Sequence, residues 1–344
     1  MNPRLSPGPG RLPCFPATSE GRDIVGEMVI DVGGRDSESP RASRARELVS
    51  VLVLVLVLVA AAVVAGRNRQ AFLDSIQRIG VGGFALSLAA ALLGTIGTYL
   101  QWRSVLIGLE VPFGVIDGAR VFFVSQLGKY LPGSVWPIVM QMEAGRSRGA
   151  NRKSMLAANL VAVVLSICVG VVLAGLLLPF SSPAALHRFW WALAALPLLL
   201  ALAHPRSLPF LLDLVLRVLR RNPLDVRMTG AATMTALGWS ALGWIAFGAH
   251  LALLAGAISA PSTGLLMLCV GGMGLAVSAG VLFLPAPAGA GMREVVLGIV
   301  LAAALTAGQV VAVVIASRVI ILLADLILAG LFAAWPPRRS RVMT

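Results

Sequence analysis

Long apolar runs separated by short arginine-rich segments dominate the hydrophobic pattern of this chain. A run of about 20 apolar residues is enough to cross a bilayer core as a helix. Segments of roughly this length, or close to it, occupy residues 48–66, 81–102, 154–178, 189–203, 231–255, 263–284 and 308–334. The pattern therefore predicts an all-α polytopic membrane protein with six to eight transmembrane helices.

Two apolar segments are interrupted by proline and glycine. The first break holds Pro132 and Gly133 and separates residues 112–128 from residues 133–144, and the second is PAPAGAGMRE at 285–294. Proline and glycine disfavour one straight helix through either break. Irregular backbone at membrane depth is tolerated only where protein buries it or where it lines a polar cavity. Each segment is therefore predicted to form a broken, re-entrant hairpin, and two full crossings are the alternative.

The basic loops predict the orientation of the chain. Residues 145–153 carry four bases and no acid, and three arginines follow the last apolar run. The positive-inside rule places both segments, and both termini, in the cytoplasm. The two hairpins then enter from opposite sides, and each has Leu-Pro at its break, at Leu131 and Leu284. This arrangement is typical of the inverted repeats of transporters; chance is the alternative, because Leu-Pro is common at helix ends.

The predicted organisation is one membrane domain, residues 47–335, between a disordered cytoplasmic tail at 1–46 and a basic cytoplasmic tail at 336–344. Residues 48–66 also resemble a signal peptide, but their length favours an uncleaved span. Residues 67–80 are predicted to form a short interfacial helix. The orientation places the three arginines of that helix outside, which the positive-inside rule does not explain.

Composition supports the membrane class and excludes several others. Hydrophobic residues make up 58% of the chain and charged residues 12%, and the mean hydropathy is +0.89. A net charge of +13 is explained by cytoplasmic loops and anionic headgroups, so no nucleic-acid partner is expected. The cysteines are isolated, and the chain lacks H-E-x-x-H, G-x-S-x-G and Walker A motifs. No metal, cofactor or catalytic activity is expected, and His250 is expected to be a hydrogen-bonded core residue.

Ionisable residues at membrane depth are the candidate functional residues. Arg120, Lys129 and Arg293 lie at or near broken helices, where free N–H groups favour an anion. Glu143 and Glu294 are predicted to balance them when the site is empty. Two further charges, Arg318 and Asp325, lie two turns apart on one helix. The alternative is that these charges pair only to hold helices together. The predicted substrate is an anionic amphiphile whose tails stay in lipid.

The motifs GKYLPGSVWPIVMQMEAGRSRG and FLPAPAGAGMREVVL resemble the lysylphosphatidylglycerol synthase transmembrane-region family, over roughly residues 48–334. The resemblance implies a membrane domain of the eight-helix type, with re-entrant segments, that moves lipids between leaflets. It implies substrate-binding roles for residues of both motifs: Lys129, Pro132, Gly133, Glu143, Arg146, Pro285, Gly289, Gly291, Arg293 and Glu294. The two-part members carry a soluble aminoacyl-transferase domain after the membrane region. This chain stops soon after Trp335, so it is not expected to make lysyl-lipid.

The predicted function is that of a flippase-like transporter in the cytoplasmic (inner) membrane. Its expected partner is a membrane phospholipid, anionic or aminoacylated, or a lipid-linked intermediate. A homo-oligomer or enzymes of envelope synthesis are further candidate partners. The alternatives are a membrane glycosyltransferase and a scaffold subunit of a cell-envelope synthesis complex.

Overall fold

The computed structural model describes residues 62–111, 113–130, 136–146, 150–183, 228–282 and 291–335, with Val59, Gly289 and scattered positions between 186 and 217. Contacts divide the chain between Ser43 and Arg44, and all described residues belong to the second unit. The predicted tails at 1–46 and 336–344 lie outside the described residues. The predicted spans at 48–66 and 189–203 lie mostly outside them.

Five helices in the described part of the chain are long and apolar enough to cross a membrane. They are α3 (Arg69–Gly108), α6 (Arg152–Leu177), α9 (Gly230–Ile258), α10 (Thr263–Leu282) and α12 (Ala307–Ala334). Shorter helices are α4 (Val115–Gln126), α5 (Trp136–Arg146) and α11 (Met292–Leu301), with 3-10 turns η2 (Leu127–Tyr130), η3 (Pro179–Ser181) and η4 (Pro205–Ser207). No strand occurs within these ranges. The predicted fold class, an all-α polytopic membrane protein, is confirmed.

Helix α3 contains the predicted boundary between an interfacial helix and a span. Gly80 interrupts it with φ 54° and ψ −176°, so residues 69–79 and 81–108 are two helices joined at a kink. The helix continues past the predicted end of the span at residue 102, to Gly108. Trp102 is 2% exposed and its Nε1 donates to Asn159 Oδ1 at 3.2 Å. An interior hydrogen bond therefore holds this ring.

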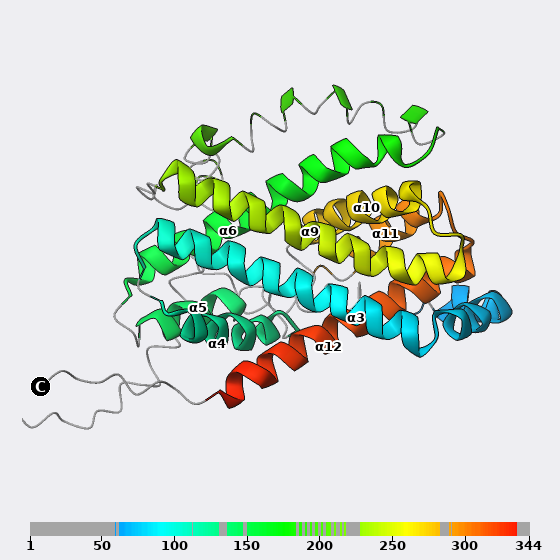
Figure 1. The fold of residues 1–344 in the computed structure, drawn as a ribbon, viewed down its shortest axis with the longest axis horizontal. Helices are drawn as coiled ribbons and strands as arrows, with labels where there is room; N and C mark the ends of the chain where they lie inside the picture. The colour runs from blue at the N-terminus through cyan, green and yellow to red at the C-terminus, as the bar shows by residue number, and fades with distance from the viewer. Residues whose placement is uncertain are drawn as a thin grey trace, which may run out of the picture. The chain divides into compact units, whose positions relative to one another are not determined.

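Small residues bring the long helices together. Figure 1 shows α3 and α9 side by side. A Cβ atom added at Gly97 would lie 2.8 Å from Cα of Gly243, so only glycine permits this crossing. In lipid there is no hydrophobic driving force between helices, so close backbone contact through small residues holds them together. The predicted role of His250 is confirmed: the ring is fully buried, with Nδ1 2.9 Å from Ser87 Oγ and Nε2 2.8 Å from Ser317 Oγ. It links α3, α9 and α12.

The two predicted hairpins pack into different hydrophobic cores. Helices α4 and α5 pack against each other, as do α10 and α11. Residues of α4 and α5 join a core with α6 and the second half of α3, whereas α10 and α11 join a core with α9. Helix α12 contributes Ile320 and Ala324 to the second core and Leu328 to the first. Helices α3, α6 and α9 also contribute residues to both cores, so the two cores meet along the long helices, α12 among them.

The two hairpins share an order of elements but differ in arm length. In both, a helix, a break and a short helix are followed by a long helix, α6 in the first case and α12 in the second. The arms α4, α5 and α11 have 12, 11 and 10 residues, or about half a bilayer core at 1.5 Å per residue. Helix α10 has 20 residues and is long enough to cross alone. The breaks are confirmed, and the inverted orientation stays a prediction.

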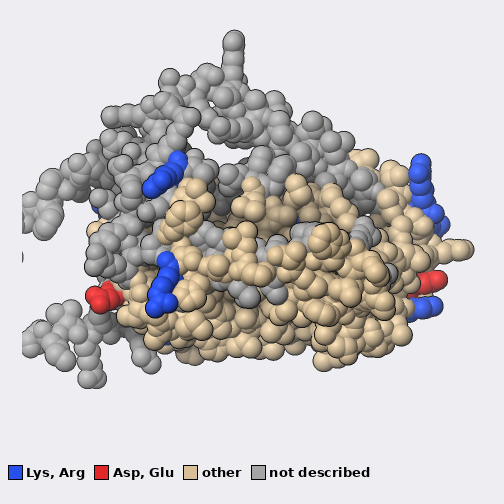
Figure 2. Space-filling view, turned by 90° about the horizontal axis from the view of Figure 1, so that it is seen from above, with Lys and Arg blue, Asp and Glu red and all other residues tan. Residues whose placement is uncertain are grey.

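Charged side chains on the described surface avoid its middle. On the face in Figure 2, the described Lys, Arg, Asp and Glu side chains lie toward the two sides of the view, with uncharged surface between them. Among the described residues, large apolar side chains of the long helices are well exposed, for example Leu93 at 63% and Leu242 at 56%. Such exposure suits a hydrocarbon solvent.

Candidate functional site

Helix α12 places two ionisable side chains deep in the membrane. It has 28 residues and is therefore about 42 Å long. Arg318 and Asp325 both lie within five residues of its middle. They are seven residues apart, or close to two full turns, so they lie on nearly the same face of the helix. Charges at this depth are costly and are usually found at functional sites.

The first break supplies partners for Asp325. Lys129 and Tyr130 end η2, the 3-10 turn that follows α4. Lys129 Nζ lies 2.7 Å from Asp325 Oδ2, and Tyr130 Oη donates to the same oxygen at 2.5 Å. The ammonium group also lies 5.4 Å from the centre of the Tyr130 ring. The Asp325 carboxylate is 2% exposed and Lys129 is 28% exposed. One carboxylate thus anchors the tip of the first hairpin to α12.

The second break supplies the partner for Arg318. Glu294 in the first turn of α11 accepts a hydrogen bond from Arg318 Nε and forms an ion pair with it. Its other oxygen, Oε2, accepts from the backbone N–H of Gly291 at 2.7 Å, which caps the helix. Gly291 has φ 88°, a conformation that favours glycine. The same carboxylate therefore starts α11 and binds α12.

Arg293 lies between these pairs without a carboxylate partner among the described residues. Its side chain is 8% exposed, Nη2 donates to Met273 Sδ at 3.4 Å, and Nε is buried without a partner in that part of the chain. It lies within electrostatic range of Arg318, Glu294, Tyr130 and Asp325. A thioether is a weak acceptor, so among the described residues this guanidinium has no strong hydrogen-bond acceptor.

Close backbone packing holds Arg293 in the interior. Gly289, just before α11, has φ 67°, and a Cβ atom there would lie 2.8 Å from Cα of Gly280 in α10. A Cβ atom on Gly280 would in turn lie 3.6 Å from Cβ of Arg293. Two glycines therefore let α11 begin directly against α10, and this contact directs Arg293 toward the interior.

These six residues, Lys129, Tyr130, Arg293, Glu294, Arg318 and Asp325, form what we call the charge cluster. Three bases face two carboxylates, which leaves one positive charge. Besides Arg293 Nε, the Nη2 atom of Arg318 is buried without a partner in the described part of the chain. The described residues hold no group of three His, Cys, Asp or Glu side chains that could bind a metal. Chemically, the cluster offers unused N–H donors and a surplus charge to an anion.

The other residues predicted for the site lie elsewhere. Arg120 is half-buried on α4, and no ion pair or hydrogen bond among the described residues joins it to the charge cluster. Glu143 and Arg146 pair with each other on the exposed face of α5, with Oε1 and Nη1 3.9 Å apart. The counter-charge of Lys129 thus comes from Asp325 and not from Glu143. The remaining three, Pro132, Gly133 and Pro285, lie outside the described residues.

Sequence reasoning missed Tyr130 and underrated Asp325. One alternative from the sequence was that Asp325 pairs along α12 with Arg318, seven residues away. Instead the two charges turn to different hairpins, Asp325 to η2 and Arg318 to α11. The available signal was an acid and a base at the same depth and on one face of a helix that follows two broken hairpins.

The fold and the charge cluster define a multi-pass α-helical membrane protein with a buried, positively charged site between two broken hairpins. The chain belongs to the lysylphosphatidylglycerol synthase transmembrane-region family, whose model matches residues 48–329. Both breaks and every residue of the charge cluster lie within that match. No curated protein matches the chain. Membership in the family connects the protein with membrane lipids.

Proposed function

We propose that this protein moves an anionic or aminoacylated phospholipid, or a lipid-linked intermediate, between the leaflets of the cytoplasmic membrane. The observation that carries the proposal is the surplus charge of the cluster, with Arg293 buried and lacking a carboxylate partner among the described residues. Family membership supports a lipid substrate. The proposal includes no catalytic step and no cofactor, and it places both termini in the cytoplasm.

The base that lacks a carboxylate partner among the described residues, Arg293, carries an energetic cost. An isolated buried charge costs several kcal/mol unless it is paired and hydrogen-bonded. In the empty site Glu294 and Asp325 neutralise Arg318 and Lys129, while Arg293 has only a weak acceptor. A lipid phosphate diester carries one negative charge and several acceptor oxygens. Its arrival would bring the cluster to neutrality and use the donors of Arg293 and Arg318 that lack partners.

Pairing of the phosphate with the cluster would also help the headgroup to cross the membrane. A phosphate that enters hydrocarbon alone pays the full desolvation cost of a charge. A neutral complex of phosphate and cluster near the middle of α12 lowers that cost, and the lipid tails never need to leave the bilayer. The two existing ion pairs keep the hairpin tips in contact with α12 when no lipid is bound. The barrier to headgroup crossing is therefore lowered without a permanent polar pore.

The test is a reconstituted leaflet-exchange assay with fluorescent anionic and zwitterionic lipids. Arg293→Gln and Lys129→Gln are expected to abolish exchange of the anionic lipid while expression and topology stay near normal. Lys129→Arg retains the positive charge but replaces a compact ammonium with a planar guanidinium, so it is expected to keep partial activity. Arg146→Gln is the matched control, because Arg146 is half exposed in an ion pair on α5.

Two results would contradict the proposal. Unchanged exchange in both Arg293→Gln and Lys129→Gln would assign the charges to structural pairing alone. A loss of exchange in Arg146→Gln equal to that in Arg293→Gln would show that the effect of removing a base is not specific to the charge cluster.

A further inference from the structure

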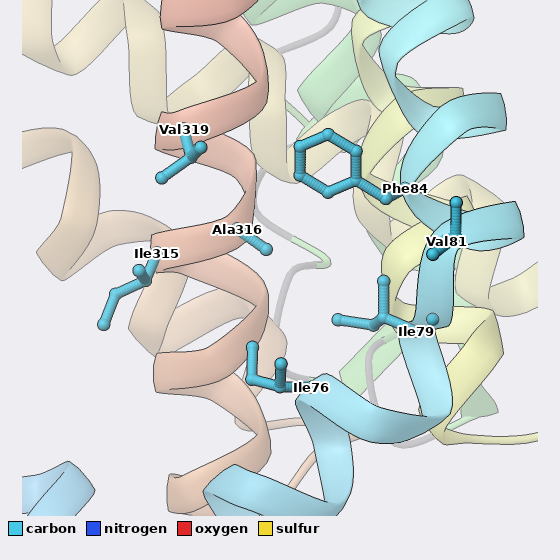
Figure 3. A pocket seen from close by; sticks show the side chains of 8 residues that line it. Ile76, Ile79, Val81, Phe84, Ile315, Ala316 and Val319 are labelled. Carbon is cyan, nitrogen blue, oxygen red and sulfur yellow. The ribbon is translucent and has the colours of Figure 1, made fainter.

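A groove opens where α3 bends. Gly80 has a left-handed φ of 54°, and a Cβ atom there would meet nothing within 4 Å, so glycine is required for the backbone conformation and not for space. Beside it lies a cavity of about 440 Å³ between α3 and α12. Its apolar wall includes Ile76, Ile79 and Phe84 of α3 and Ile315, Ala316 and Val319 of α12, as Figure 3 shows. We call it the kink groove.

The kink groove lies at one edge of the membrane-spanning region. Arg78 Nη1 donates to the carbonyl oxygen of Ile258 at 3.5 Å, and Ile258 is the last residue of α9. A Cβ atom on Gly83 would lie 3.8 Å from Cβ of Ala257. The kink is therefore level with the end of α9, and the groove extends from there alongside Phe84 into the span. Val81, at 88% exposed, shows that its rim faces the surroundings.

Basic side chains lie just before the kink. Arg67, Arg69 and Arg78 are all exposed, and Asp74 is the one acid in this stretch of sequence. The predicted orientation puts them on the outer face, where the positive-inside rule gives them no role. A basic segment directly above an apolar groove has the same order of polarity as a phospholipid in a leaflet: anionic headgroup at the surface, hydrocarbon beneath.

We propose that the kink groove holds one acyl chain of an anionic phospholipid, whose phosphate lies against Arg69, on the same helix face as Ile76. Two independent features support this occupant, the apolar cavity at hydrocarbon depth and the complementary charge at its mouth. The cavity volume lies within the range of small-ligand sites, about 300–1,000 Å³. Binding here does not depend on transport, since a resident lipid needs no leaflet exchange.

The site also lies close to the charge cluster. Val319, which lines the kink groove, is the neighbour in sequence of Arg318, which pairs with Glu294. A lipid held in the groove is thus within one turn of α12 of the cluster. This position suits a lipid that waits at one leaflet before its headgroup enters the interior.

The experiment is photo-crosslinking of the full chain in phosphatidylcholine vesicles. In one sample the photoreactive acyl chain is carried by phosphatidylglycerol, and in the other by phosphatidylcholine. Mapped adducts are expected at residues 76–84 and 315–319 and are expected to be more abundant with phosphatidylglycerol. Each surface base contributes about 1 kcal/mol toward an anionic lipid, or about fivefold in occupancy. Arg69→Gln should reduce the preference by about that factor.

Two variants with added bulk, one inside the kink groove and one outside it, distinguish lipid bound in the groove from ordinary lipid contact. Val319→Phe adds bulk at a residue that is 44% exposed, so the helix packing tolerates it, and adducts at residues 76–84 should fall severalfold. Ala89→Phe, at another exposed position of α3 outside the groove, should leave them unchanged. Adducts spread evenly over all exposed helices, or equal labelling by the two lipids, would overturn the proposal. Loss of exchange in Arg293→Gln with adducts unchanged would separate this site from the transport proposal.

Discussion

The contact between Lys129 and Asp325 gives the sharpest quantitative prediction. Lys129→Gln leaves the Asp325 carboxylate, 2% exposed, with the Tyr130 hydroxyl as its remaining partner among the described residues. Removing one partner of a buried ion pair lowers the free energy of unfolding by about 3–5 kcal/mol. Because Tyr130 still donates a hydrogen bond to the carboxylate, we expect a value near the lower limit, about 3 kcal/mol. Asp325→Asn keeps a neutral acceptor oxygen for the Lys129 ammonium, so its cost is the weaker hydrogen bond, about 1–2 kcal/mol.

The double variant tests whether the two residues act as a pair. With both charges removed, neither side chain is left as an uncompensated ion. The double variant is therefore expected to lower the free energy of unfolding by about 2 kcal/mol. This is less than the sum of the two single effects, and the difference is a coupling energy of about 2–3 kcal/mol. The assay is reversible unfolding in mixed micelles for the wild type, both single variants and the double variant. Additive costs would refute the pairing.

The double variant also probes the surplus charge. Lys129→Gln brings the cluster to neutrality, whereas adding Asp325→Asn restores one positive charge and keeps Arg293. Exchange of an anionic lipid is therefore expected to be lost in Lys129→Gln and partly recovered in the double variant. Recovery would identify net charge as the requirement, and no recovery would identify the lysine ammonium itself.

Three further predictions concern the second break and the topology. Glu294→Gln keeps an acceptor for the helix cap and should lower the melting temperature less than Glu294→Ala, which loses both the cap, worth about 1 kcal/mol, and the contact with α12. Gly289→Ala should destabilise, because its φ is 67° and its Cβ would meet α10, whereas Gly298→Ala meets nothing within 4 Å and should be neutral or stabilising by about 1 kcal/mol in thermal melts. In a cysteine-free background, a cysteine at position 147 should be shielded from an impermeant thiol reagent in intact cells and one at position 262 should react; labelling at 147 would reject the inward-returning hairpin.

The sequence predicts the elements of this fold better than their partners. Apolar length and breaker residues placed α6, α9 and α12 within a few residues of their observed bounds and placed a boundary at Gly80. In a membrane, however, a span is apolar on most of its surface, so periodicity does not tell which face meets which helix. For this reason the sequence pattern did not predict the partner of Trp102 or the residue at which α3 ends.

The charge cluster illustrates the same limit. Depth and local breaks identified Lys129, Arg293, Glu294 and Arg318 as candidates, and the structure brings all four together. The sequence also predicted that Asp325 lies at membrane depth. Its contact with Lys129, however, joins residues nearly two hundred positions apart. Such a pairing depends on how two hairpins pack against α12, and local sequence carries no record of it. Arg120 is a base at membrane depth like three members of the charge cluster, but it lies outside the cluster.

The most direct test of the central claim measures whether a lipid phosphate reaches the charge cluster. The chain has two lysines, Lys129 and Lys153, so Lys153→Gln leaves one lysine ammonium in the protein. With isotope-labelled lysine and vesicles containing phosphatidylglycerol, solid-state NMR can detect dipolar coupling between that nitrogen and lipid phosphorus. The account predicts coupling at Lys129 that disappears in Arg293→Gln. Absence of coupling in the Lys153→Gln protein, or coupling that persists unchanged in Arg293→Gln, would contradict it.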